Sequence, residues 1–296
     1  MSNQTKSGII LQSIGGFYYV ETADAVYECK ARGAFRKEGI TPLSGDRVTV
    51  SVQGDGVGVL EEILESRNRL LRPPVANLDC LAIVVSVTDP KPNLFLLDKM
   101  IALAEDNAIE PIVVITKSDL DDTAMLEAVY RQAGFPLFVV TNTDAESVIP
   151  LKAFLKGKIT AFTGNSGVGK SSLLNLIDPA LHRETGEISK KLGRGRHTTR
   201  SVVLFPWSDG GYLADTPGFS ALDLERTQPI DKERLFDCFR EFSPYFGACR
   251  FTGCSHIHEP DCAVRAAVKA GEISPSRYES YVNLYKEAEQ RKPWKT

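Results

Sequence analysis

Residues 164–171 have the sequence GNSGVGKS, which matches the pattern G-x-x-x-x-G-K-[ST] at every defined position. The apolar run 158–163 predicts a strand before this segment, and residues 172–177 have the spacing of a helix after it. Glycines let the backbone curl so that its N–H groups and the positive end of the helix dipole face one anion. The alternative is a glycine turn with an exposed lysine, but the flanking strand and helix favour a phosphate-binding loop in an α/β domain.

This loop is expected to bind a nucleoside triphosphate. Lys170 would reach the β- and γ-phosphates and act in catalysis, and the Ser171 hydroxyl would bind Mg²⁺. The other expected contacts come from Gly164, Asn165, Ser166, Gly167, Val168, Gly169 and Ser172.

A second motif, TKSD at 116–119, follows an apolar run and resembles the [NT]-K-x-D element of GTPases. The Asp119 carboxylate can accept hydrogen bonds from N1–H and the exocyclic amine of guanine, a pair that adenine does not offer. The stem of Lys117 would pack along the base, and Thr116 and Ser118 complete the predicted guanine site. The alternative is that Ser118 or Asp119 caps the helix that follows.

Two further segments complete a GTPase set. DTPG at 215–218 matches D-x-x-G, so Asp215 would hold Mg²⁺ through water and the Gly218 amide would meet the γ-phosphate. The alternative here is an ordinary Pro-Gly turn. RHTTR at 196–200 precedes it, and Thr199 is expected to bind Mg²⁺, with a solvated basic loop as the alternative.

The order of these motifs is unusual. GTPases usually place the phosphate loop first and the K-x-D element late, whereas 116–119 here precedes 164–171, and 215–218 follows. A parallel α/β sheet tolerates this rotation, because the motifs lie at strand ends and new termini can open in a surface loop. The rotation leaves the segment after DTPG at the end of the domain, so we expect a C-terminal domain to anchor it.

The rest of the chain predicts a multidomain protein. Residues 1–66 alternate short β-prone stretches with turn residues, which predicts a small barrel such as an OB-fold, although an SH3-like barrel has the same periodicity. Residues 67–222 alternate strands and helices, which predicts an α/β domain with a mainly parallel sheet. Residues 223–296 lose the strand pattern and are expected to be mainly helical.

The C-terminal segment also contains a predicted metal site. Cys249, Cys254, His256 and Cys262 offer three sulfurs and one imidazole, a complete tetrahedral set for one structural Zn²⁺. His258 competes for the histidine position. Reduced thiols in a small core are the alternative.

Taken in chain order, TKSD, GNSGVGKS, RHTTR, DTPGF and the Cys/His cluster resemble a known family over essentially the whole chain. This family is the circularly permuted GTPases that mature the bacterial small ribosomal subunit, also called ribosome small subunit-dependent GTPase A. The resemblance implies an OB-like barrel, a permuted GTPase domain and a zinc domain that uses His256. It also implies late-stage 30S assembly, binding to 16S rRNA, and GTP hydrolysis stimulated by the small subunit. Residues 141–143, Thr-Asn-Thr, depart from the Ser-Ala that the family usually has beside the guanine.

The sequence predicts slow hydrolysis by the isolated protein. Ras-type enzymes orient the attacking water with a Gln near the residue after D-x-x-G, but Phe219 stands there in this chain. His197 is the candidate catalytic group, because an imidazole can position or polarise water, and the resemblance implies this role. The alternative is a loop histidine that meets RNA or solvent.

Composition adds little about partners. The net charge of -3 gives no overall sign of nucleic-acid binding, and the basic groups at 30–37, 67–72 and 190–200 fit solvated surface charges equally well. The N-terminus lacks an apolar signal core and no apolar run is long enough for a membrane span, so we expect a cytoplasmic protein. The sequence leaves the oligomeric state open, and a monomer is the default expectation.

Two other functions remain compatible with these motifs. One is a ribosome-docking factor that uses GTP only as a conformational ligand, which the presence of Phe219 keeps open. The other is an ATP-dependent enzyme, in which ATP would compete with GTP.

Overall fold

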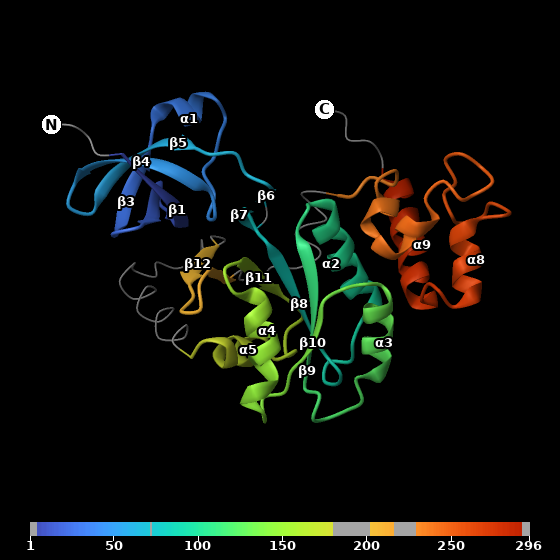
Figure 1. Ribbon diagram of the computed structural model, residues 1–296. Helices are drawn as coiled ribbons and strands as arrows, with labels where there is room; N and C mark the ends of the chain where they lie inside the picture. Colours follow the sequence, from blue (N-terminus) through green and yellow to red (C-terminus); the bar gives the residue numbers. More distant parts are fainter. Residues whose placement is uncertain (1–4, 72, 180–201, 216–228, 292–296) are drawn as a thin grey trace. The chain divides into compact units, whose positions relative to one another are not determined.

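The computed structural model describes residues 5–71, 73–179, 202–215 and 229–291 (Figure 1). The chain forms two compact units, each built from three segments. The first unit comprises residues 1–80, 152–162 and 174–219, and the second comprises residues 81–151, 163–173 and 220–296.

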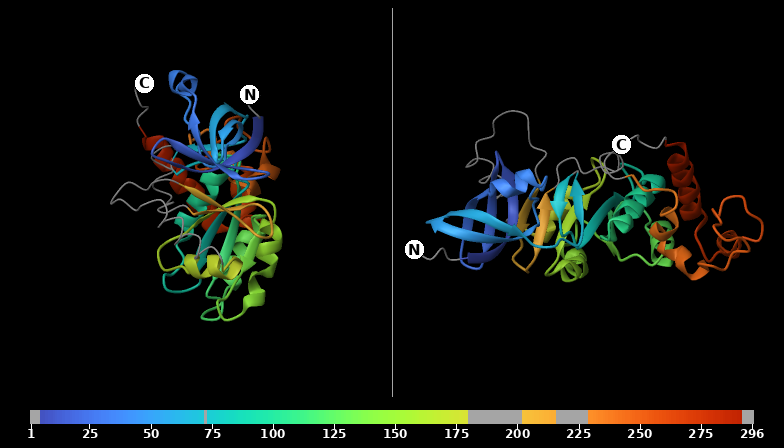
Figure 2. Two further views of the ribbon diagram at one scale, coloured as in Figure 1. Left: turned by 90° about the vertical axis from the view of Figure 1, so that its left-hand side faces the viewer. Right: turned by 90° about the horizontal axis from the view of Figure 1, so that it is seen from above.

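The first unit begins with a closed barrel, which Figure 2 shows from two further sides. Its strand order is β1-β2-β3-β5-β4, and β3 pairs with β5 in parallel whereas the other neighbours are antiparallel. Placing β5 between β3 and β4 is a Greek-key arrangement, as in an OB-fold, which confirms the predicted barrel. The short helix α1 (Gly33–Lys37) connects β3 to β4. The strands are β1 (Thr5–Ile14), β2 (Phe17–Thr22), β3 (Val26–Ala31), β4 (Arg47–Gly54) and β5 (Val57–Ile63).

The barrel closes around alternate side chains of its strands. Period-two alternation places one face of each strand inside, and the inward residues are almost wholly buried. This barrel core consists of Ile10, Val20, Tyr27, Cys29, Val48, Val50 and Leu60 from the strands, together with Phe35 of α1.

The strands of the central α/β domain divide between the two units. In the second unit the order is β10-β9-β8, and in the first it is β11-β13-β12. The pairs β9–β10 and β11–β13 are parallel, as predicted, whereas β12 is antiparallel to β13. Every residue of β8 and β11 is buried, which is typical of strands covered on both faces. The strands are β8 (Cys80–Ser86), β9 (Glu110–Thr116), β10 (Leu137–Val139), β11 (Ile159–Thr163), β12 (Val203–Pro206) and β13 (Tyr212–Asp215).

Helix α2 begins after a capping residue. The side chain of Asn93 accepts a hydrogen bond from the backbone N–H of Leu96 and caps α2. None of the helices in the described residues combines the length and apolar character that crossing a membrane requires. The elements are α2 (Leu94–Asp106), α3 (Ala124–Gln132), the 3-10 helix η1 (Ala145–Val148), α4 (Ile149–Leu155) and α5 (Lys170–Ile177), with the hairpin β6 (Arg69–Leu71) and β7 (Pro74–Ala76).

The C-terminal part is helical, as predicted, and belongs to the second unit. It contains the 3-10 helices η2 (Leu235–Cys238) and η3 (Arg240–Tyr245), followed by α8 (Ala263–Ala270) and α9 (Pro275–Gln290). Gly271 ends α8 in the left-handed conformation that glycine adopts most easily, with φ of 78°.

A fully buried arginine ties α9 to the rest of the second unit. Arg277 donates to Asp98 of α2 at 2.8 Å and to Glu241 of η3 at 2.7 Å. The Tyr130 hydroxyl of α3 also donates to Asp98, at 3.0 Å. The guanidinium carbon lies 4.6 Å from the ring centroid of Phe239, so the charge is paired and stacked inside the core.

Candidate functional site

The phosphate loop connects β11 to α5 along a path that has positive φ angles at three glycines. Gly164 has φ of 151°, and a Cβ atom there would lie 2.4 Å from the carbonyl oxygen of Val84. Gly167 and Gly169 have φ of 83° and 89°, in the left-handed region. The glycines of GNSGVGKS therefore have the conformational role that the motif predicts.

Several residues of the loop are exposed, as an anion-binding site requires. Asn165, Ser166 and Gly167 are exposed, and Ser171 is exposed in the first turn of α5. The ammonium group of Lys170 donates to the Gly164 carbonyl at 3.0 Å, so the lysine folds back over the loop. A cation and a helix N-terminus at one turn provide the positive charge that phosphates need.

TKSD lies directly against this loop, within the same unit. The hydroxyl of Thr116 is buried and donates to the carbonyl of Val168 at 2.6 Å, so the end of β9 supports the loop. Lys117 has φ of 58° and donates to the carbonyl of Asp89. Asp119 is exposed and therefore open to a base. The structure thus joins two motifs that lie 52 residues apart at Thr116 and Val168.

The structure also reveals a residue that the sequence prediction left unassigned. The Thr141 hydroxyl donates to one oxygen of the Asp119 carboxylate at 2.6 Å. The backbone N–H of Thr141 donates to the Ser147 hydroxyl at 3.2 Å. The Thr141 hydroxyl also lies 2.8 Å from the hydroxyl of Thr143. The signal in the sequence was the position of this loop just after β10, since parallel neighbours β9 and β10 end at the same edge.

The remaining predicted nucleotide contacts belong to the segments 196–200 and 215–218. His197, Thr199 and Gly218 lie outside the described residues, and so does the side chain of Asp215. The backbone of Asp215 ends β13, as the sequence pattern predicts for D-x-x-G.

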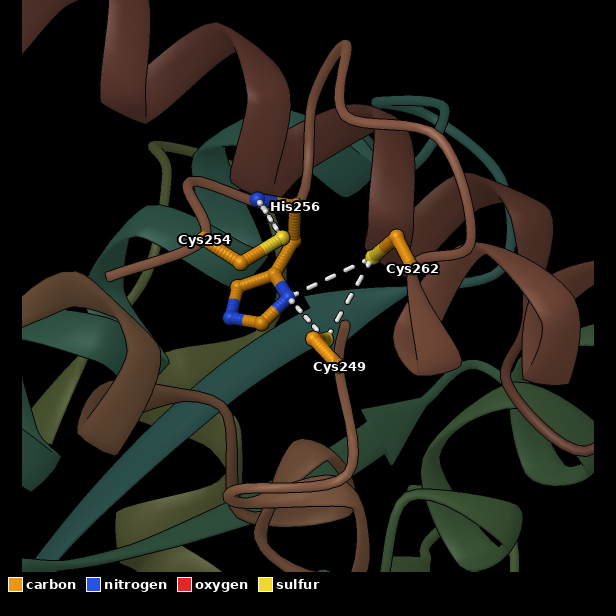
Figure 3. A group of neighbouring side chains, drawn as sticks. All are labelled: Cys249, Cys254, His256 and Cys262. Carbon is orange, nitrogen blue, oxygen red and sulfur yellow. Dashed lines mark hydrogen bonds between the residues drawn. The ribbon is translucent and has the colours of Figure 1, made fainter. Parts of the chain in front are cut away.

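The four predicted metal ligands come together in the second unit (Figure 3). The Sγ atoms of Cys249 and Cys262 are 3.8 Å apart, and Nδ1 of His256 lies 3.5 Å from the first and 3.4 Å from the second. The Sγ atom of Cys254 completes a group whose atoms all lie within 4.8 Å of one another. His258 is exposed and outside this group.

These distances fit a metal ion. A tetrahedral centre with metal–sulfur bonds of about 2.3 Å and metal–nitrogen bonds of about 2.0–2.1 Å places two sulfurs about 3.8 Å apart and sulfur and nitrogen about 3.5 Å apart. Burial lowers the pKa of His256, which favours the neutral imidazole that a metal requires. The spacing of Cys249, His256 and Cys262 thus matches a tetrahedral centre, and the group of four could hold a metal ion.

A carboxylate organises the backbone beside these ligands. Burial alone would raise the pKa of Glu259, but hydrogen bonds from the Ser255 hydroxyl and from backbone N–H groups lower it to about 2. Glu259 is therefore a carboxylate at neutral pH and a strong acceptor for the loop.

Comparisons with known proteins agree with this arrangement. Residues 63–225 match the model of the RsgA GTPase family, and residues 7–60 match the RsgA N-terminal domain. The small ribosomal subunit biogenesis GTPase RsgA of Caldanaerobacter subterraneus subsp. tengcongensis is 48% identical over 287 residues, 96% of each chain. The protein of the same name from Geobacillus thermodenitrificans is 43% identical over 97% of this chain and 98% of its own.

Two solved structures have the same fold. YjeQ from Thermotoga maritima is 36% identical, with a TM-score of 0.85 and coverage of 98% of this chain and 100% of its own. YloQ, described as a circularly permuted GTPase, is 37% identical, with a TM-score of 0.81 and coverage of 98% and 97%. The family models and the relatives together cover almost the whole chain, and this chain is a member of the RsgA GTPase family.

Proposed function

We propose that this GTPase assists a late step in the maturation of the 30S ribosomal subunit, with GTP hydrolysis stimulated by the subunit. The proposal that the chain binds GTP rests on the contact between TKSD and the phosphate loop, through Thr116 and Val168. This contact would bring a phosphate site and a base site together in one unit. The ribosomal part rests on relatives named small ribosomal subunit biogenesis GTPases at 43–48% identity. The proposal includes binding to 16S rRNA and action as a cytoplasmic monomer.

The phosphate side of the site supplies charge and positioning. Backbone N–H groups of the loop and the Lys170 ammonium group would bind the β- and γ-phosphates. The Ser171 hydroxyl, exposed at the start of α5, is an oxygen ligand of the kind that Mg²⁺ takes, and Thr199 and Asp215 would complete its site. When bound, Mg²⁺ neutralises charge on the phosphates.

Base selection would depend on Asp119 and on the threonine that orients it. Thr141 donates to one carboxylate oxygen, which fixes the plane in which Asp119 can accept from guanine. Thr141 would therefore support the guanine site through Asp119.

Replacing Asp119 with asparagine should lower GTP affinity about 10- to 100-fold. In the complex an amide N–H₂ would face the guanine amine, and a donor that the bound base buries without a partner costs about 1–3 kcal/mol. XTP, which carries a carbonyl at that position, should gain affinity in the same variant. Both are measured by titration with fluorescent nucleotides. Asp121→Asn is the matched control, since Asp121 is exposed on the same turn. Unchanged GTP affinity in Asp119→Asn would contradict the assigned base site.

The metal is proposed to be Zn²⁺ in a structural role. Three thiolates and one imidazole at tetrahedral spacing form a closed donor set with soft ligands. A closed set leaves no position for substrate, so the ion would stabilise the C-terminal part.

His197 is proposed to position the attacking water, because Phe219 cannot do so. This assignment rests on the sequence and the family resemblance.

The function is tested by phosphate release from GTP and from ATP, with and without purified small ribosomal subunits. We expect strong stimulation by the subunits that is specific for GTP and largely lost in His197→Ala. Tight GTP binding without stimulation would favour a docking factor that uses GTP as a conformational ligand. Equal hydrolysis of ATP would contradict guanine selection by Asp119.

A further inference from the structure

The loop between Cys254 and Cys262 contains Glu259, whose side chain accepts hydrogen bonds from the loop itself. Oε1 of Glu259 accepts from the backbone N–H of Ser255 at 2.8 Å and from its hydroxyl at 2.6 Å. Oε2 accepts from the backbone N–H groups of Ile257 and His258, both at 3.2 Å. Four donors on three residues thus converge on one carboxylate, and hydrogen bonds to an ionised acceptor are about twice as strong as neutral ones.

Two tyrosines of α9 also form hydrogen bonds with the same loop. The Tyr278 hydroxyl donates to the carbonyl of His256 at 2.8 Å, and the Tyr281 hydroxyl donates to the carbonyl of Ser255 at 2.9 Å. N–H groups therefore face Glu259 while carbonyls face the two tyrosines. The backbone of this loop is fixed on both sides.

Such support is needed because His256 has φ of 61°, a left-handed conformation that costs a non-glycine residue free energy. In this conformation its N–H donates to the Sγ atom of Cys254 at 3.4 Å while its ring points to the other two sulfurs (Figure 3). Without the hydrogen bonds around it, the loop would relax toward ordinary φ values. The ring of His256 would then leave the position that a tetrahedral ion requires.

We propose that Glu259 is the positioning residue of the metal site, and that it sets metal affinity by holding the loop of Cys254 and His256 in its binding conformation before the ion arrives. The inference rests on the proposed zinc site and adds a residue that binds no metal itself. Partners that orient metal ligands typically change metal affinity about 10- to 100-fold when they are removed.

The test measures the Zn²⁺ dissociation constant of the full-length chain by competition with a chromophoric chelator. Glu259→Gln keeps the size of the side chain but places an N–H₂ group against backbone donors, so Zn²⁺ should bind about 10- to 100-fold more weakly. Tyr278→Phe, which removes one hydroxyl, should weaken binding about five-fold. At saturating Co²⁺, both variants should give the tetrahedral absorption spectrum of the wild type, because the ligands themselves remain.

Asp261→Asn is the matched control, since it removes the same charge one residue from Cys262 but pairs only with the exposed Arg250 among the described residues. Its Zn²⁺ affinity should stay within about two-fold of wild type. The inference is overturned if Glu259→Gln also stays within that range, or if Asp261→Asn weakens binding equally, which would indicate a general charge effect. A wild-type chain that binds no Zn²⁺ would instead overturn the zinc site itself.

Discussion

Lys170→Ala should lower kcat for GTP hydrolysis by about 10²–10³-fold, the usual effect of removing one preorganised donor from developing charge. The lysine begins α5 and lies folded over the loop, with its ammonium group on the Gly164 carbonyl. Because the lysine lies on the loop that would bind the phosphates, its ammonium group can reach the charge that develops on them. The measurement is single-turnover phosphate release at saturating GTP and saturating small subunits.

Lys156→Ala is the control for this prediction. Lys156 is exposed and outside the phosphate loop, so its loss should leave kcat unchanged. If Lys170→Ala kept more than about one tenth of the wild-type kcat, the assignment would be contradicted. An effect that small is what the loss of an exposed charge produces, not the loss of a donor to the transition state.

Arg277→Met should lower the free energy of unfolding by about 3–5 kcal/mol, because it leaves two buried carboxylates without their partner. Arg277 is fully buried, and its ion pairs with Asp98 and Glu241 are almost wholly shielded from water. Burial already raises the pKa of Asp98 despite the opposing charge of Arg277, so the carboxylate depends on this arginine for its charged form. Urea denaturation followed by far-ultraviolet circular dichroism measures the change.

Arg250→Met is the matched control. Arg250 pairs with Asp261 at 2.9 Å, but the two side chains are 66% and 65% exposed. Exposed pairs contribute about 0–1 kcal/mol, so this variant should unfold close to the wild type. If Arg277→Met costs no more than Arg250→Met, the buried network does not hold α9 to α2 and η3.

The phosphate loop and the metal ligands were predictable from sequence for a local reason. Positive φ at Gly164 and Gly167 demands glycine, and a tetrahedral soft-ligand site demands Cys and His, so the chemistry selects residue types at fixed spacing. The short, alternating strands of the barrel were predictable because a period of two follows directly from strand geometry.

The support around these sites needed the tertiary structure. The Thr141–Asp119 bond joins residues 22 apart, and the Arg277–Asp98 pair joins residues 179 apart. Thr, Asp and Arg occur throughout soluble proteins, so the residue type alone does not identify the distant partner of a hydrogen bond or ion pair.

Sequence by itself therefore determined the family, the rotated motif order, the nucleotide loop and the four candidate ligands, because each is a pattern of residue types and of their order along the chain. Only the tertiary structure decided that Thr116 supports the phosphate loop, that Thr141 orients Asp119 and that Glu259 holds the metal-binding loop. The physical reason is that hydrogen bonds of this kind are specified by the position and direction of two groups in space, which folding alone brings together.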